Sequence, residues 1–316
     1  MQSERFFSAV QRNRGKKMEG KKKLYFIYNP HSGREQIRTK LFYILQIFSE
    51  AGYEMTVYPT RSKKDAVKQI EQLGDEYDLV ICSGGDGTMD EVVQGMMQRD
   101  KKLPIGYIPS GTVNDFARSL KIPRDMLKAA RIAVGGTDFP CDMGAFNQEY
   151  FVYIAAFGIF TDVAYSTRQN VKNVLGHMAY LLEGVKRLTN IPSYHMHLYS
   201  EELEEEGDFI FGMVTNSRSV GGFKSIIGRK VQFDDGVFEV TFIKMPNNAV
   251  ELQEILGAII LKEIDSKYMY SFRTSHLRVE AEGMVPWTLD GEFGGECRSV
   301  VIKNYQKALK IRVDNR

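Results

Sequence analysis

A glycine-rich segment, Ser83-Gly84-Gly85-Asp86-Gly87-Thr88, lies between an apolar run, Leu79 to Cys82, and a helical pattern, Met89 to Met97. Its three glycines let the backbone approach a ligand closely and adopt positive φ angles. The free N–H groups at the start of the following helix stabilise an anion. The segment therefore predicts a phosphate-binding turn between a strand and a helix. Because a carboxylate beside phosphates is repulsive without a cation between them, Asp86 also indicates Mg²⁺.

The same alternation of strand and helix patterns runs from Leu24 to Ile108. Apolar runs of strand length predict strands at 24–28, 53–59, 79–82 and 105–108, and apolar residues at helical spacing predict helices at 37–48, 66–73 and 89–97. Such alternation is typical of a parallel sheet flanked by helices. We therefore expect a basic N-terminal tail over residues 1–23 and an α/β nucleotide-binding domain over residues 24–141.

The pattern changes after Cys141. Strands are expected at 151–160, 194–199, 209–215, 231–244, 272–281 and 300–303, and two helices at 175–188 and 250–261. Most of these strands are joined by short turns, which predicts a mostly antiparallel β region. We assign it to a second domain over residues 142–303, and we expect the C-terminal segment, 304–316, to return to the first domain. The acidic run from Glu201 to Asp208 is expected to be a solvated loop.

Two further loops follow strands of the predicted parallel sheet. Asn29-Pro30-His31-Ser32-Gly33 follows the first strand, and Pro109 to Asp115 follows the fourth. Thr60 lies at the end of the second strand. Ligands of open α/β sheets bind beyond the carboxyl ends of the strands, so all these segments meet at one edge. The glycines match neither a dinucleotide fingerprint nor the lysine-containing phosphate loop of nucleoside triphosphatases.

Composition narrows the class of partner and compartment. The chain has 316 residues and a net charge of only +2, so we expect no nucleic-acid partner. Three widely spaced cysteines give no disulfide framework, which favours the cytoplasm. The longest apolar stretch, Tyr150 to Phe160, is too short to span a membrane. The basic tail is either solvated or attracted to an anionic membrane surface.

Three motifs occur together: NPxSG at 29–33, GGDGTxxE at 84–91 and GTxND at 111–115. With this combination the chain resembles the catalytic domain of diacylglycerol kinases. The resemblance is strongest to the soluble bacterial diacylglycerol kinases and the YegS-like lipid kinases, with sphingosine kinases more distant. It runs from about Lys22 to the C-terminus. NAD kinases share the GGDGT element, so the combination carries the resemblance.

The resemblance implies an α/β nucleotide-binding domain followed by a β-sandwich-like domain, with the active site in the cleft between them. It implies contact with ATP by residues of all three motifs and of the second strand: Asn29, Pro30, His31, Ser32, Gly33, Thr60, Gly84, Gly85, Asp86, Gly87, Thr88, Met89, Asp90, Glu91, Thr112 and Asp115. It also implies catalytic roles for Asp290 and Glu292. Arg34 stands where relatives often have lysine.

Phosphoryl transfer needs charge neutralisation and a group that accepts the proton of the attacking alcohol. Asp290 and Glu292 lie two residues apart and would share one face of an extended strand. We expect Asp290 to be the base and Glu292, with Asp86 and Asp115, to hold Mg²⁺. The resemblance further implies a structural Mg²⁺ on the loop Gln232 to Val237, bound by Asp235 and by the carbonyls of Gln232 and Val237. A plain hairpin turn explains that loop equally well.

The leading hypothesis is an ATP- and Mg²⁺-dependent lipid kinase that phosphorylates the hydroxyl of diacylglycerol or a related lipid. It would be cytoplasmic, associate peripherally with the membrane surface, and could pair its long antiparallel edges in a homodimer. One alternative is a kinase of a soluble substrate, similar to NAD kinase. Another is a nucleotide-binding regulatory protein without turnover, although the acidic residues Asp86, Asp290 and Glu292 are all present.

Overall fold

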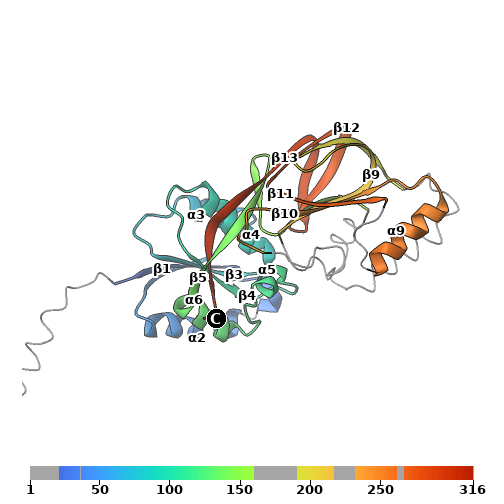
Figure 1. Ribbon diagram of the computed structural model, residues 1–316. Helices are drawn as coiled ribbons and strands as arrows, with labels where there is room; N and C mark the ends of the chain where they lie inside the picture. Colours follow the sequence, from blue (N-terminus) through green and yellow to red (C-terminus); the bar gives the residue numbers. More distant parts are fainter. Residues whose placement is uncertain (1–20, 36, 160–190, 217–231, 262–266, 316) are drawn as a thin grey trace, which may run out of the picture.

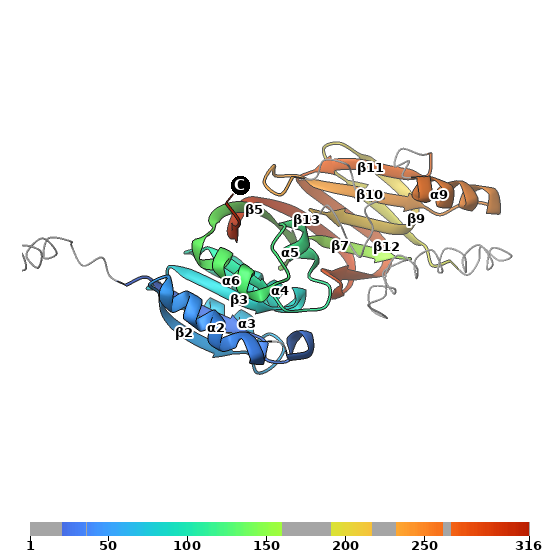
Figure 2. The same cartoon turned by 90° about the horizontal axis from the view of Figure 1, so that it is seen from below.

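The computed structural model describes residues 21–35, 37–159, 191–216, 232–261 and 267–315. The strands of these residues form one continuous hydrogen-bonded sheet. Its N-terminal portion is parallel and carries helices on both faces, whereas the remainder is antiparallel (Figures 1 and 2). We call residues 23–135 the parallel part and residues 137–313 the antiparallel part. No helix among the described residues has the length and hydropathy needed to span a membrane.

The parallel part has the sheet order β4-β3-β1-β2. Helices α2 and α6 lie on one side of this sheet, and α3 and α4 lie on the other (Figure 1). Strand β3 is buried along its whole length, as expected for a central strand covered on both faces. The elements are β1 Lys23–Tyr28, η1 Ser32–Glu35, α2 Ile37–Glu50, β2 Glu54–Pro59, α3 Asp65–Glu71, β3 Leu79–Gly84, α4 Asp86–Gln98, β4 Ile105–Pro109, α5 Asp115–Ser119 and α6 Met126–Gly135.

The antiparallel part surrounds a second core that includes Phe157, Phe242 and Trp287. Its longest strand, β13, pairs with β12 near its start and with β5 along most of the rest, and its end pairs with β4 of the parallel part. The elements are β5 Thr137–Phe146, β6 Glu149–Phe151, β7 Ile154–Gly158, β8 Tyr194–Tyr199, β9 Glu204–Thr215, β10 Phe238–Lys244, α9 Ala249–Leu261, β11 Met269–Thr274, β12 His276–Leu289 and β13 Glu292–Val313.

The expected change from an α/β pattern to an antiparallel β pattern is therefore present. The predicted domain boundaries stay predictions, because β5 and β13 link both parts continuously. The helix predicted at 175–188 lies outside the described residues. The solvated loop predicted for the acidic run is wrong, because Glu204 to Asp208 belong to β9 and pair with β8. There the carboxylates of Asp208 and Glu206 flank His195, and Glu204 contacts His197. Both histidines lie at the surface.

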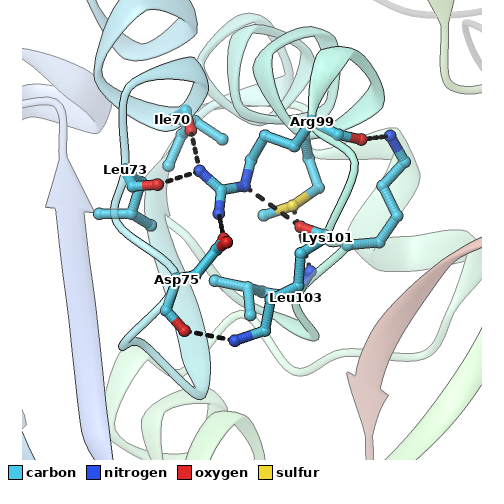
Figure 3. Close-up of polar contacts among 8 residues, drawn as sticks. Ile70, Leu73, Asp75, Arg99, Lys101 and Leu103 are labelled. Carbon is cyan, nitrogen blue, oxygen red and sulfur yellow. Dashed lines mark hydrogen bonds and ion pairs between the residues drawn. The ribbon is translucent and has the colours of Figure 1, made fainter.

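A buried arginine fixes α3 against the end of α4. The guanidinium of Arg99 donates to the carbonyls of Ile70, at 3.1 Å, and Leu73, and it pairs with Asp75 at 2.9 Å (Figure 3). A cation at the C-terminus of a helix is favoured by the exposed carbonyl groups there. The opposite end of α3 also contacts α4, because the Glu91 carboxylate accepts the N–H groups of Lys64 and Ala66. Both ends of α3 are thus anchored.

Candidate active site

The three glycine-containing loops predicted from the sequence lie against one another. Gly33 has φ +57°, and a Cβ at this position would overlap the carbonyl oxygen of Ser110. A Cβ on Gly111 would lie 2.6 Å from the Cα of Gly85. The N–H of Ser110 donates to Gly84 O at 2.8 Å. The loops after β1, β3 and β4 therefore form a single backbone surface, which we call the glycine cradle: Asn29–Gly33, Gly84–Thr88 and Ser110–Asp115.

Polar side chains brace the glycine cradle. Asn29 Nδ2 donates to Thr88 Oγ1 at 3.3 Å, and Asn114 Nδ2 donates to Gly111 O at 2.7 Å. Thr60 is held at the same edge by its N–H, which donates to Tyr28 O. The hydroxyls of Ser83 and Ser110 are buried without a hydrogen-bond partner among the described residues. Because an unpaired buried hydroxyl is unfavourable, these two groups fit a site whose polar ligand completes them.

Asp86 begins α4 and connects two of the loops. Its carboxylate accepts the N–H of Asp115 at 3.2 Å and of Phe116 at 3.4 Å. Burial raises the pKa of Asp86, the two N–H groups oppose that shift, and the charge of Asp115 raises it further. Asp115 is itself buried and pairs with Arg118 at 3.2 Å. The two carboxylates are therefore neighbours on the rim of the cradle.

Asp290 lies in the tight turn between β12 and β13, where its own φ is +51° and that of Gly291 is +84°. Its carboxylate accepts three backbone N–H groups, from Val152 at 2.6 Å and from Tyr153 and Ile154 at 2.9 Å each. The Tyr153 hydroxyl donates to Asp290 O at 2.8 Å. The side chain is thus fixed by the chain segment that joins β6 to β7.

The expectation that Asp290 and Glu292 share one face is wrong, because the chain reverses between them. Asp290 is 8% exposed, whereas the Glu292 side chain is 65% exposed and pairs with Lys63 Nζ at 3.3 Å. Lys63 lies in the loop between β2 and α3. The two acidic residues of the late motif therefore have different environments, one buried and one at the surface.

The Asp290 turn nevertheless meets the parallel part. Asp290 lies beside Asp90 of α4. Burial, and then the charge of Asp290, raises the pKa of Asp90 well above its usual value. Burial raises the pKa of Asp290 to about 6, although its three N–H donors lower it, and the charge of Asp86 raises it further. One turn after Asp90, Gln94 Oε1 accepts the N–H of Tyr150 at 3.0 Å, and Gln94 Nε2 donates to Tyr150 O. The two parts are joined beside the cradle.

Aspartates from both parts of the molecule also lie near Tyr153, whose hydroxyl is buried. Burial raises its pKa most, and the charges of four aspartates raise it further: Asp290, Asp86, Asp115 and Asp90. One of these aspartates belongs to the antiparallel part, and the others belong to the parallel part. The structure therefore gathers acidic groups from both parts next to the glycine cradle.

Three residues predicted to contact ATP have other partners. The Asp90 carboxyl faces Asp290, and the Met89 side chain is buried in the core. The Glu91 carboxylate accepts Lys64 N at 2.8 Å and Ala66 N at 3.2 Å. These side chains support the site rather than face the cradle. Thr112 and Gly87, by contrast, are exposed on it.

The predicted magnesium set is only partly assembled. Among the described ranges, no group of three or more His, Cys, Asp or Glu side chains is close enough to hold a metal. Glu292 faces Lys63, so the prediction that it joins Asp86 and Asp115 is not supported by this geometry. Mg²⁺ bound with a nucleotide usually takes one or two carboxylates together with phosphate oxygens and water. Asp86 and Asp115 provide that smaller set, so the donors present fit Mg²⁺.

The loop Gln232 to Val237, predicted to bind a structural Mg²⁺, is held by contacts with other residues of the protein. The Asp235 carboxylate pairs with Arg273 and accepts the N–H of Val237 at 3.3 Å. The N–H of Gly236 donates to Asp142 Oδ2 at 2.7 Å. In this arrangement Arg273 neutralises the Asp235 carboxylate, and a structural Mg²⁺ bound by Gln232, Asp235 and Val237 stays a prediction.

Sequence reasoning missed several residues that shape the site. Gln94, Tyr153 and Lys63 carry no motif, and their partners are far away in the sequence. The Asp290-Gly291 pair did carry a signal, because Asp-Gly between two apolar runs is typical of a hairpin turn.

Comparisons with known proteins point to one family. The family model described as the diacylglycerol kinase catalytic domain matches residues 23–146. The diacylglycerol kinase of Bacillus subtilis is 35% identical over 287 residues, which cover 90% of this chain and 94% of that protein. The diacylglycerol kinase of Staphylococcus carnosus is 32% identical over 279 residues, 87% of this chain and 90% of that protein. A solved structure of a diacylglycerol kinase from Bacillus anthracis covers 94% of this chain and 98% of its own, with a TM-score of 0.71 and 21% identity. That likeness concerns the fold alone.

Proposed function

Since this chain belongs to the diacylglycerol kinase family, we propose that it transfers the γ-phosphoryl group of ATP, with Mg²⁺, to the hydroxyl of diacylglycerol or a related lipid. The observation that supports this most is the meeting of the Asp290 turn with α4 beside the glycine cradle, where Gln94 of α4 also hydrogen-bonds Tyr150. A phosphate-binding surface and a buried carboxyl group that can accept a proton are thereby brought together from distant parts of the chain.

In this proposal the glycine cradle binds the phosphates of ATP. Its loops can pack this closely because Gly33, Gly85 and Gly111 have no side chains, and Gly87, where a Cβ would meet no atom within 4 Å, is exposed on it. The buried hydroxyls of Ser83 and Ser110 would donate to the ligand. Asp86 and Asp115 would hold Mg²⁺, which neutralises charge on the phosphates when it is bound.

Asp290 is the group proposed to accept the proton of the attacking hydroxyl. A carboxyl with a pKa of about 6 is ionised at neutral pH and is a stronger base than an ordinary aspartate. Its three N–H donors fix the orientation of the carboxylate. Glu292 is less suited to this role, because it is exposed and paired with Lys63.

A lipid substrate implies that the enzyme acts at a membrane surface, where the acyl chains of the acceptor remain in the bilayer. Peripheral association is therefore part of the proposal. Most of the basic tail that could assist it, residues 1–20 of 1–23, lies outside the described residues. A homodimer remains a proposal drawn from the sequence.

The substrate class can be tested with purified protein, γ-labelled ATP and Mg²⁺. Diacylglycerol, monoacylglycerol and sphingosine are offered in mixed micelles, and NAD is offered in solution. We expect label in the phosphorylated lipid and none in NADP, with loss of label when Mg²⁺ is chelated. Label in NADP would instead select a soluble-substrate kinase. Folded protein that binds ATP but labels nothing would indicate a regulatory protein.

A further inference from the structure

Lys63 forms an ion pair between the two parts of the molecule. Its Nζ lies 3.3 Å from Oε2 of Glu292 at the start of β13. Lys63 follows Thr60, which stands at the sheet edge that carries the glycine cradle, and Glu292 follows the Asp290 turn. Lys63 therefore follows the sheet edge that carries the glycine cradle, and its partner Glu292 follows the turn of the proposed catalytic base.

The backbone that carries Lys63 is held on both sides. Before it, the N–H of Arg61 donates to Asp65 Oδ2 at 2.8 Å. After it, the N–H of Lys64 donates to Glu91 Oε1 at 2.8 Å, with Lys64 in the left-handed region at φ +64°. The backbone of Lys63 is thus held in place, and the four methylene groups of its side chain set how far the ammonium can reach.

The ion pair itself is weak enough to be exchanged. The Lys63 side chain is 75% exposed and that of Glu292 is 65% exposed. Exposed pairs of this kind contribute about 0–1 kcal/mol, because water screens the charges and two long side chains lose conformational freedom. A ligand with more negative charge than one carboxylate can therefore take the ammonium from Glu292.

The surroundings need added positive charge when such a ligand arrives. Four aspartates, Asp86, Asp90, Asp115 and Asp290, gather around Tyr153 beside the glycine cradle. Of the cations that the structure describes near them, Arg118 already pairs with Asp115. A triphosphate would add further negative charge, and phosphoryl transfer depends on neutralising it. A lysine with an exchangeable partner can supply part of that charge.

We propose that Lys63 is a ligand of the terminal phosphate of the bound nucleotide, an inference that rests on the proposed kinase function. In the nucleotide-free protein Glu292 holds the ammonium group. When a triphosphate occupies the glycine cradle, the ammonium transfers to the oxygens of the terminal phosphate, where charge-assisted hydrogen bonds are stronger. Glu292 is then released beside the Asp290 turn.

The test compares binding of ADP with binding of a non-hydrolysable ATP analogue, each with Mg²⁺, by titration calorimetry. Lys63→Gln should raise the Kd of the analogue roughly 10-fold, equivalent to about 1.4 kcal/mol, and the Kd of ADP less than about twofold. Lys63→Arg should restore most of the affinity for the analogue. Lys64→Gln is the matched control, because it removes the same charge one residue later and should change neither affinity.

Turnover gives an independent readout. At saturating ATP, Lys63→Gln should also lower kcat about 10-fold or more, because Lys63 would contact the phosphoryl group that is transferred. Equal losses of ADP and analogue affinity, a matching loss in Lys64→Gln, or a higher kcat in Lys63→Gln would overturn the proposal. If the wild-type protein binds ATP but phosphorylates no lipid, the proposed function fails, whereas the two affinities still decide the position of Lys63.

Discussion

Replacing Asp290 by asparagine is expected to lower kcat at least ~100-fold, the range in which general bases contribute, while the protein remains folded. The amide cannot accept the proton of the attacking hydroxyl. It can still accept the N–H groups of Tyr153 and Ile154 through its oxygen, but its NH₂ group then faces the N–H of Val152. We therefore expect a lower melting temperature as well, measured by thermal unfolding alongside steady-state kinetics.

Asp142→Asn is the matched control for that structural effect. Asp142 is also a buried aspartate, and its carboxylate accepts two backbone N–H groups, from Gly236 and Lys307, at 2.7 Å each. It is not among the aspartates that converge on Tyr153. Asp142→Asn should lower the melting temperature but leave kcat within a few-fold of the wild type. Full activity of Asp290→Asn would remove this residue from the mechanism, and an equal loss in both variants would make its role structural.

Gly33→Ala is expected to abolish tight nucleotide binding. Two effects act together, because φ +57° is strained for alanine and its Cβ would overlap the carbonyl oxygen of Ser110. The loops after β1 and β4 must then separate, which disassembles the glycine cradle. We expect the Kd for Mg²⁺–ATP to rise by at least about 10-fold, with a loss of roughly 2 kcal/mol or more in the free energy of unfolding.

Gly52→Ala is the control for this prediction, because it introduces backbone strain without steric overlap. Gly52 has φ +83°, and a Cβ there meets no atom within 4 Å. Gly52→Ala should lower the free energy of unfolding by only about 1 kcal/mol and leave the Kd for Mg²⁺–ATP unchanged. Unchanged ATP binding in Gly33→Ala would show that the cradle is not the phosphate site.

The parallel sheet and the glycine cradle could be predicted from the sequence because both depend on local patterns. An apolar strand followed by glycines and a helix specifies the turn at Gly84 to Thr88 without knowledge of the rest of the chain. The meeting of the three loops follows from parallel pairing, since the carboxyl ends of β1, β3 and β4 share one edge.

The roles of individual acidic side chains could not be predicted in the same way. Glu91 belongs to the motif expected to contact ATP, yet it accepts N–H groups at the start of α3, because that helix packs against α4. The Lys63–Glu292 pair joins residues separated by 229 positions, and no local pattern indicates it. For Asp290 the turn signal was available, but an extended strand was assumed, and the predicted direction of Glu292 was wrong as a result.

In the proposed function, two distant parts of the chain build one phosphoryl-transfer site. A crystal structure with Mg²⁺ and a non-hydrolysable ATP analogue tests it most directly. We predict that the phosphates lie against Gly33, Gly85 and Gly111, with the terminal phosphate facing the Asp290 carboxylate and within reach of Lys63. Phosphates bound away from these glycines, or too far from Asp290 for a hydroxyl group to lie between them, would contradict the account.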